Sequence, residues 1–178
     1  YKAKVNDFAD SKASVLGEYI PSKLEMEEGE NAIFMVVTND YKGYMFFLFE
    51  NGKAAKVNLN SYATKTNRKK LIKAYCDKSP LAGIEYLSDD GQLVIETTGG
   101  RCLLLDTAMV SPKAMKDTQG VACITIKKNQ KLSVVRDYVE GEFVKPTRYK
   151  AKNLPSAGAI LSNEDVMKKN NITFEGFE

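Results

Sequence analysis

The feature that most constrains the fold is the stretch from Tyr44 to Leu59, which reads YMFFLFENGKAAKVNL. It opens with a continuous apolar run, Tyr44–Phe49, that is long enough for a strand buried on both faces and too short for a buried helix. The Asn51-Gly52 dipeptide that follows accepts positive φ at both central positions of a tight turn and is a strong hairpin signal. We therefore predict a β-hairpin whose first arm is buried.

The second arm of this hairpin alternates with a period of two, as a strand does. The alternation predicts two faces, with Ala55, Val57 and Leu59 on one and Ala54, Lys56 and Asn58 on the other. We expect the second arm to be half exposed and basic.

The second arm recurs along the chain. Equivalent stretches begin at Tyr1-Lys-Ala-Lys-Val5, Lys53-Ala-Ala-Lys-Val57 and Arg101-Cys-Leu-Leu-Leu105. They are spaced by about 50 residues, the interval of a repeat array. Each is followed by a polar segment, a short predicted strand (residues 19–24, 71–75 and 121–126), a polar turn and an apolar strand (33–37, 81–87 and 132–135).

The buried arm and its turn also repeat, at residues 93–97 with Gly99-Gly100. Short strands at this spacing indicate an all-β protein, built either as a propeller-like array of blades or as stacked sandwiches. We predict about three four-stranded blades over residues 1–135, the first of them incomplete at its N-terminus. Because the chain opens on Tyr1 inside a predicted strand, we expect it to be a fragment of a longer protein.

The blade pattern weakens after residue 135, so residues 136–178 form a separate C-terminal extension in this prediction. Ser162 and Asp165 resemble a capping box, which predicts one short helix near the C-terminus. An exposed edge strand is an aggregation hazard, and we expect the extension to cap the edge of a blade.

The residue types exclude several kinds of chemistry. The chain of 178 residues has no histidine, which excludes Ser-His and Cys-His catalysis and Cys/His zinc sites formed by this chain alone. The cysteines Cys76, Cys102 and Cys123 are widely spaced, as reduced structural cysteines of a cytosolic protein are. No apolar run approaches the roughly 20 residues of a membrane helix.

Charge is separated along the chain, although the net charge is only +3. Residues 52–80 carry eight basic side chains and one acid, whereas residues 17–40 carry six acids and one lysine. A separate basic surface indicates a polyanionic partner, and the competing interpretation is a solvated, solubilising lysine-rich face.

With the repeats aligned, the chain resembles the C-terminal domain of the A subunit of bacterial type II DNA topoisomerases, DNA gyrase and topoisomerase IV. The resemblance rests on Tyr1-Lys-Ala-Lys-Val-Asn-Asp-Phe8, on Phe49-Glu-Asn-Gly-Lys-Ala-Ala-Lys-Val57, and on Gly99-Gly-Arg-Cys-Leu-Leu-Leu105 with Thr118-Gln-Gly-Val121. It covers about residues 1–135. The chain departs from the family in two motifs. The gyrase Q-R-R-G-G-K-G box is absent, and the glycine seen at Gly17 and Gly120 is replaced by lysine near Lys69-Lys70.

The resemblance implies a β-pinwheel, a propeller-like disc whose basic outer rim binds and bends duplex DNA. It implies a non-catalytic domain, without a cofactor of its own, of an ATP-dependent topoisomerase that binds ATP and Mg²⁺ elsewhere. The implied partners are duplex DNA, the A-subunit dimer and the ATPase B subunit, with no membrane partner. The implied location is the cytoplasm, in association with the nucleoid.

The basic residues of the predicted loops and adjoining strands are the candidate DNA contacts. They are Lys12, Lys53, Lys56, Lys65, Arg68, Lys69, Lys70, Lys73, Arg101, Lys113 and Lys116. Such contacts position DNA through its phosphates and do not read bases. No catalytic or metal-binding residue is predicted. The alternative function is a protein-interaction propeller that does not bind DNA, with the acidic residues 17–40 as its support; an enzyme has the least support.

Overall fold

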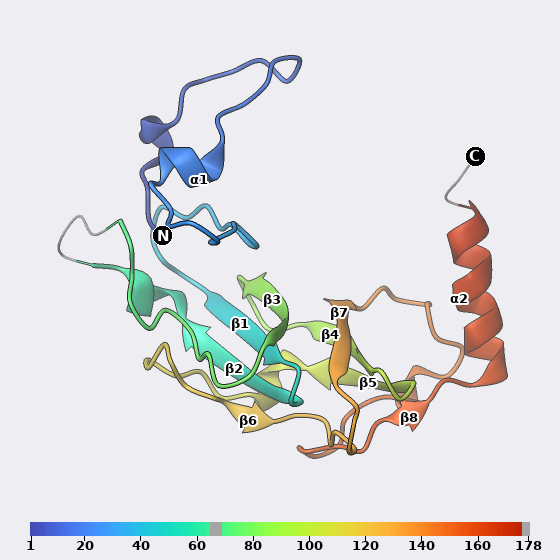
Figure 1. The fold of residues 1–178 in the computed structure, drawn as a ribbon. Coiled ribbons are helices and arrows are strands. Elements are labelled where there is room, and N and C mark those ends of the chain that lie inside the picture. Colours follow the sequence, from blue (N-terminus) through green and yellow to red (C-terminus); the bar gives the residue numbers. More distant parts are fainter. Residues whose placement is uncertain (65–68, 176–178) are drawn as a thin grey trace.

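The computed structural model describes residues 1–64 and 69–175. In these residues the chain forms two four-stranded antiparallel sheets, in the orders β3-β1-β2-β6 and β7-β4-β5-β8 (Figure 1). We call them blade 1 and blade 2. The strands are β1 (Tyr44–Phe49), β2 (Lys53–Asn58), β3 (Leu81–Leu87), β4 (Gln92–Thr97), β5 (Arg101–Asp106), β6 (Val121–Ala122), β7 (Leu132–Asp137) and β8 (Ala159–Ile160). The helices are α1 (Ile20–Lys23) and α2 (Asn163–Glu175), with short 3-10 turns at Val5–Asp7, Leu59–Tyr62, Thr107–Met109 and Pro146–Arg148.

The predicted hairpin is confirmed as the centre of blade 1. Strands β1 and β2 pair from Tyr44 opposite Asn58 to Leu48 opposite Ala54, and Asn51 and Gly52 make the turn between them. Gly52 has a φ of +79°, a conformation that glycine adopts without steric cost. The equivalent hairpin of blade 2, β4 with β5, is joined through Gly99-Gly100 in the same way.

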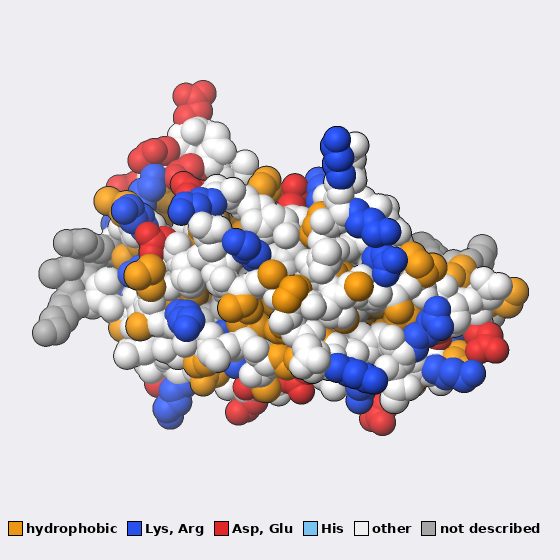
Figure 2. All heavy atoms as spheres, turned by 90° about the horizontal axis from the view of Figure 1, so that it is seen from below, with side chains coloured by type: hydrophobic (Ala, Val, Ile, Leu, Met, Phe, Trp, Pro, Cys, Tyr) orange, Lys and Arg blue, Asp and Glu red, His pale blue; other side chains and the backbone are white. Residues whose placement is uncertain are grey.

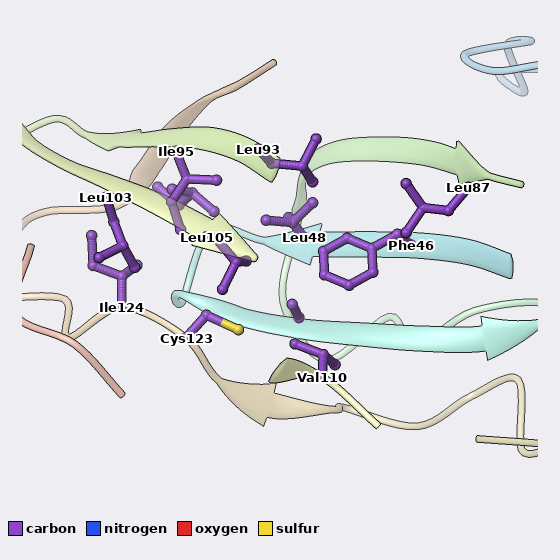
Figure 3. Close-up of a cluster of buried hydrophobic side chains, with 12 residues drawn as sticks. Phe46, Leu48, Leu87, Leu93, Ile95, Leu103, Leu105, Val110, Cys123 and Ile124 are labelled. Atoms are coloured by element: carbon purple, nitrogen blue, oxygen red, sulfur yellow. The ribbon is translucent and has the colours of Figure 1, made fainter. Parts of the chain in front are cut away.

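Side chains from both blades share one core. Phe46 and Leu48 of β1 meet Leu93 and Ile95 of β4 in this cluster, and Figure 3 shows them pointing into the space between the two hairpins. The alternate residues of these central strands face the other way, into two further clusters. The central strands are therefore buried on both faces, as the continuous apolar run of β1 predicted.

The fourth strand of each blade comes from a later part of the chain. Strand β6, which follows β5 in sequence, crosses back to pair with β2, and β8 from the C-terminal region pairs with β5. Each arrives through a glycine of positive φ, Gly120 for β6 and Gly158 for β8. A Cβ on Gly120 would lie 1.8 Å from the carbonyl oxygen of Ala54, so only glycine permits this close approach.

The C-terminal region covers the outer face of blade 2. Phe143 and Tyr149 pack on the β4 and β5 side chains there. Helix α2 begins at the predicted cap, where the amide of Asp165 donates to Oγ of Ser162 at 3.2 Å. Oδ2 of Asp165 accepts from the Tyr149 hydroxyl at 2.5 Å and from Ser162 Oγ at 2.6 Å. These contacts tie the start of α2 to blade 2.

The strands predicted in the first repeat are wrong. Residues 1–43, all of them described, contain no strand: residues 20–23 of the predicted strand 19–24 form α1, and residues 1–5 and 33–37 pair with no strand (Figure 1). The short strand predicted at residues 71–75 is also absent, and its place in blade 1 is taken by β6. A strand needs a neighbour for its backbone hydrogen bonds, and an apolar pattern does not supply one.

Replacing Gly120 by alanine should destabilise the protein by more than about 2 kcal/mol, because a left-handed backbone and a backbone clash are combined there. Gly141→Ala is the matched control, since Gly141 has a φ of +84° but no atom within 4 Å of an added Cβ. It should lose only the backbone component of about 1–2 kcal/mol. Urea denaturation measures both, and equal losses would show that the approach of β6 to β2 is not close.

Asp165→Asn should cost about 1–3 kcal/mol at neutral pH, because the carboxylate accepts hydrogen bonds from Ser162, Tyr149 and the Val144 amide. Burial raises the pKa of Asp165, but these hydrogen bonds outweigh it and hold the pKa below its usual 3.8. These hydrogen bonds therefore stabilise the fold fully above the unfolded-state pKa of the carboxyl. The stabilisation is lost as the pH falls through the lower pKa of the folded state.

The difference in unfolding free energy between the wild type and Asp165→Asn should accordingly shrink as the pH is lowered from neutral to well below 3.8. Glu164→Gln, an exposed acid in the same helical turn, serves as the control and should change little at any pH. A difference that stays constant across this pH range would contradict the assignment of the carboxylate.

Candidate nucleic-acid interface

A basic segment runs along the outer edge of blade 1. Residues 110–120, which we call the first edge segment, connect the turn Thr107–Met109 to β6 and lie beside β2 in space. The amide of Lys113 donates to the Lys56 carbonyl at 2.8 Å, and the Lys113 carbonyl accepts from the Asn58 amide at 3.0 Å. Two backbone hydrogen bonds therefore fix Lys113 against β2 while its side chain stays exposed to solvent.

Two more candidate lysines lie along the same edge. Lys116 donates to the Ser61 carbonyl at 3.3 Å and lies 5.9 Å from the centre of the Tyr62 ring. Lys53, the first residue of β2, donates to Oε1 of Gln119 at 3.1 Å. An ammonium has three donors, so each of these contacts leaves donors for a phosphate oxygen. The structure thus brings Lys53, Lys113 and Lys116 together on one edge.

Blade 2 repeats this arrangement with residues that sequence reasoning did not select. Residues 146–158, which we call the second edge segment, precede β8 in the sequence and lie beside β5 in space. Lys150 forms a β-bridge with Leu104 of β5, as Lys113 does with Val57 of β2. The Leu104 amide donates to the Tyr149 carbonyl at 2.8 Å, and the Ala151 amide donates to the Leu104 carbonyl at 3.0 Å. The Lys150 and Lys152 side chains are exposed.

Arg101 begins β5 as Lys53 begins β2. Its Nη1 donates to the carbonyls of Ala157 at 3.2 Å and Gly158 at 2.9 Å, which places the guanidinium beside the second edge segment. The sequence signal for this segment was the echo of Tyr1-Lys-Ala-Lys4 in Tyr149-Lys-Ala-Lys152, together with a second glycine before β8.

Lys69 and Lys70 are neutralised by acids of the N-terminal region. Lys69 pairs with Glu25 at 2.8 Å, and Lys70 pairs with Glu27 at 2.7 Å and Glu30 at 2.8 Å. Hydrogen bonds from Lys70, Tyr1 and the Glu27 amide lower the pKa of Glu30 to about 2. The acidic segment thus compensates part of the basic one within the chain.

The remaining candidates are dispersed. Lys12 lies exposed in the N-terminal region, and Lys73 is exposed in the connection between Tyr62 and β3. Lys65 and Arg68 lie outside the described residues. Figure 2 shows Lys and Arg side chains in several separate groups across one face, with hydrophobic side chains between them. The candidate interface is therefore a series of small basic groups, of which the two edge segments are built in the same way.

Lys56 lies inside the protein, which corrects the expectation that it belongs to a half-exposed basic arm and contacts DNA. It is 2% exposed, and its ammonium pairs with Asp90 and lies 4.5 Å from the centre of the Tyr44 ring. The Asp90 carboxylate also accepts from the Thr107 hydroxyl at 2.7 Å. The Lys56 hydrogen bond is the main cause that lowers the pKa of Asp90. Lys56 thus ties β2 to the turn before β4, and a phosphate does not reach it.

The two partners of this ion pair should not be equivalent on mutation. Asp90→Ala leaves a buried ammonium without its counterion and should cost about 3 kcal/mol. Lys56→Met should cost less, about 1 kcal/mol, because the Asp90 side chain is 40% exposed and stays hydrated. Urea denaturation at neutral pH compares the two variants. The reverse order of stability would contradict the buried position of Lys56.

The described part of the chain contains no helix with the length and apolar character needed to cross a membrane. Within the same residues, no group of three or more His, Cys, Asp and Glu side chains is arranged to hold a metal ion.

No protein-family profile matches the chain, and no curated protein sequence does. Solved structures do match. The C-terminal domain of DNA topoisomerase IV has a TM-score of 0.65 at 22% identity, covering 78% of this chain and 43% of that one. The DNA gyrase A C-terminal domain has a TM-score of 0.58 at 13% identity, covering 80% and 52%. The E. coli ParC C-terminal domain has a TM-score of 0.60 at 14% identity, covering 85% and 68%.

This chain spans about half the length of the topoisomerase IV and gyrase domains that it matches. At these identities the likeness concerns the fold. It agrees with the two antiparallel four-stranded sheets of the structure and with the resemblance seen in the repeated sequence stretches. The chain has the β-pinwheel fold of the C-terminal domains of topoisomerase IV and DNA gyrase A subunits.

Proposed function

We propose that this chain is a DNA-binding domain of a type II topoisomerase A subunit, and that it holds duplex DNA through the two edge segments. The observation that carries the proposal is their repetition. In each blade the strand β2 or β5 begins with a basic residue, and backbone hydrogen bonds hold an edge segment with lysines against that strand. The side chains of Lys113, Lys150 and Lys152 are exposed, and that of Lys116 is half-buried. The binding residues of the proposal are Lys53, Lys113 and Lys116 on blade 1 and Arg101, Lys150 and Lys152 on blade 2.

Phosphate contacts explain the chemistry of these groups. Lysines on a rigid edge neutralise phosphates and release condensed counterions, which supplies affinity without sequence preference. The edge segments present ammonium groups from a backbone that is already fixed, so little ordering of the chain accompanies binding.

Two similar edges on adjacent blades favour DNA that curves from one to the other. Bending a duplex of about 20–30 base pairs costs on the order of 1–6 kcal/mol, and DNA contacts on the second edge segment offset that cost. In a whole enzyme, such a domain guides the duplex during strand passage. The chemistry, the ATP and the Mg²⁺ then belong to other parts of the A subunit and to the B subunit, and the assembly acts on cytoplasmic, nucleoid DNA.

The test is fluorescence anisotropy of a labelled duplex titrated with the protein over a range of salt concentrations. Lys113→Ala/Lys150→Ala should weaken binding on the order of tenfold at low salt and reduce the slope of log K against log salt by about 1 for each lysine removed. The backbone hydrogen bonds that hold both positions are kept in these variants, so circular dichroism should be unchanged.

Lys4→Ala/Lys78→Ala is the matched control, because it removes the same charge from two exposed lysines outside the edge segments. It should change the affinity only slightly. A wild type that does not bind at low salt would overturn the proposal. An equal loss of DNA affinity in the two double variants would show that binding depends on net charge alone. That result would also contradict a role for the edge segments.

A protein-interaction module is the second candidate, and the acidic N-terminal region was its support. In the structure Glu25, Glu27 and Glu30 are paired with Lys69 and Lys70 of the same chain, which leaves less acidic surface for a partner. A pull-down with and without nuclease separates the two functions, since capture through DNA is lost on nuclease treatment.

A further inference from the structure

A cleft of about 420 Å³ opens at the end of blade 1 where β1 begins and β2 ends, and the duplex contacts proposed above do not use it. This volume is within the range of small-molecule sites in proteins. The walls come from the residues before β1, from the end of β2 with the turn after it, and from Ala114 of the first edge segment. The aromatic and polar side chains that line the cleft are those of Tyr41, Lys42, Tyr44, Asn58, Asn60 and Ser61.

Two tyrosine rings line this cleft, and a lysine holds each of them. The Lys2 ammonium lies 5.5 Å from the centre of the Tyr41 ring, and the Lys56 ammonium lies 4.5 Å from that of the Tyr44 ring. A ring has two faces, so each tyrosine keeps one face for a stacked ligand. Tyr41 also has a φ of +54°, a conformation that residues with side chains rarely adopt and that concentrates at functional sites.

Two carboxamides in the cleft are left without a protein partner. Among the described residues, neither the Asn58 nor the Asn60 side chain makes a hydrogen bond. A carboxamide offers two donors and an acceptor, which suits the mixed donor and acceptor edge of a nucleobase. The backbone beside them is fixed, since the Leu59 amide donates to the Gly43 carbonyl at 2.9 Å. The carboxamides are thus presented from a rigid wall.

The rim of the cleft is basic. The Lys42 ammonium lies 3.1 Å from the Asp40 carboxylate, and because this pair is exposed it is weak enough for a phosphate to compete. On the opposite wall, Ala114 follows Lys113 in the first edge segment. Lys116 donates to the carbonyl of Ser61, which lines the same cleft. Lysines therefore lie on two sides of the opening.

Blade 2 has the same backbone arrangement at this place but not the same chemistry. The Thr107 amide donates to the Gly91 carbonyl at 2.9 Å, which is the counterpart of the Leu59 hydrogen bond in blade 1. The strand register matches the six lining residues with Asp89, Asp90, Gln92, Asp106, Ala108 and Met109. This second set has three acids and no aromatic ring. The chemistry of the cleft is therefore particular to blade 1 and does not follow from the fold alone.

We propose that the cleft binds an unpaired nucleobase of single-stranded DNA, with the flanking phosphates on Lys42, Lys113 and Lys116. The base stacks on a tyrosine and its edge meets the carboxamides. A base inside a duplex does not enter, because its faces are stacked and its edge is paired. The site goes beyond the proposed function, since duplex DNA needs only the phosphate contacts of the edge segments.

The test is fluorescence anisotropy of a labelled single strand of about 12 nucleotides without self-complementarity, run beside the labelled duplex. Tyr41→Leu/Asn60→Ala removes one ring and one carboxamide without changing charge. It should weaken binding of the single strand about tenfold, which is the effect of losing one base–aromatic stack. Duplex affinity and circular dichroism should not change, because the edge segments are intact.

Tyr19→Leu/Asn6→Ala is the matched control, since it removes the same two groups from exposed positions outside the cleft. It should leave the affinity for both DNAs unchanged. The position of the base is measured separately on the wild type. A single strand with a photoreactive iodouracil base should crosslink to Tyr41 or Tyr44, as identified by mass spectrometry of the peptides.

Each outcome decides the proposal. Equal losses in the cleft variant and the control would overturn it, as would crosslinks that map outside the cleft. A free nucleoside monophosphate that displaces the strand at equal concentration would also overturn it, because the flanking phosphates of a strand add to its affinity. Binding of the single strand without the duplex would contradict the proposed function and leave this site standing. Duplex binding with a single strand insensitive to the cleft would do the reverse.

Discussion

The open edge of a β-hairpin is the constraint on which the rest of this structure depends. A two-stranded hairpin is marginal in water, and its outer backbone groups need partners. Strands β2 and β5 obtain theirs from segments that arrive later in the chain, and the Gly52 carbonyl accepts the amides of Cys123 at 2.9 Å and Ile124 at 3.2 Å. Each edge segment runs along β2 or β5 before β6 or β8 pairs with that strand. The segment that supplies the fourth strand of a blade therefore also positions the lysines beside it.

The local parts of the fold could be predicted from the sequence. The apolar run of β1, the Asn51-Gly52 turn and the cap at Ser162 each carry their signal within a few residues. The runs at residues 1–5 and 33–37 carry the same strand signal but form no strand, because sheet pairing depends on a neighbour that pattern does not provide. The identity of the exchanged strands was likewise beyond local pattern, since β6 pairs with a hairpin far back in the chain.

The candidate interface was predictable to a similar extent. Lys113 and Lys116 followed from the repeat alignment, and the structure places both beside β2. The prediction of Lys56 as a contact is wrong, because alternation along a strand does not distinguish a solvent-exposed face from one that a distant part of the chain covers, here the turn that contains Asp90. Lys150 was not predicted, because the repeated blade pattern weakens after residue 135, whereas the position of Lys150 depends only on its bridge to β5.

The exchange of strands also sets an order of events during synthesis. Blade 1 cannot close when β2 leaves the ribosome, because β6 lies about 60 residues further along, which is several seconds at about 5–20 residues per second. During that interval the backbone groups on the outer edge of β2 are available to pair with another strand. The outer edge of β5 is in the same state until β8 has been made. The hairpin of β1 and β2 thus gains its fourth strand only after the hairpin of β4 and β5 has emerged, and blade 2 gains its own only when β8 has been made.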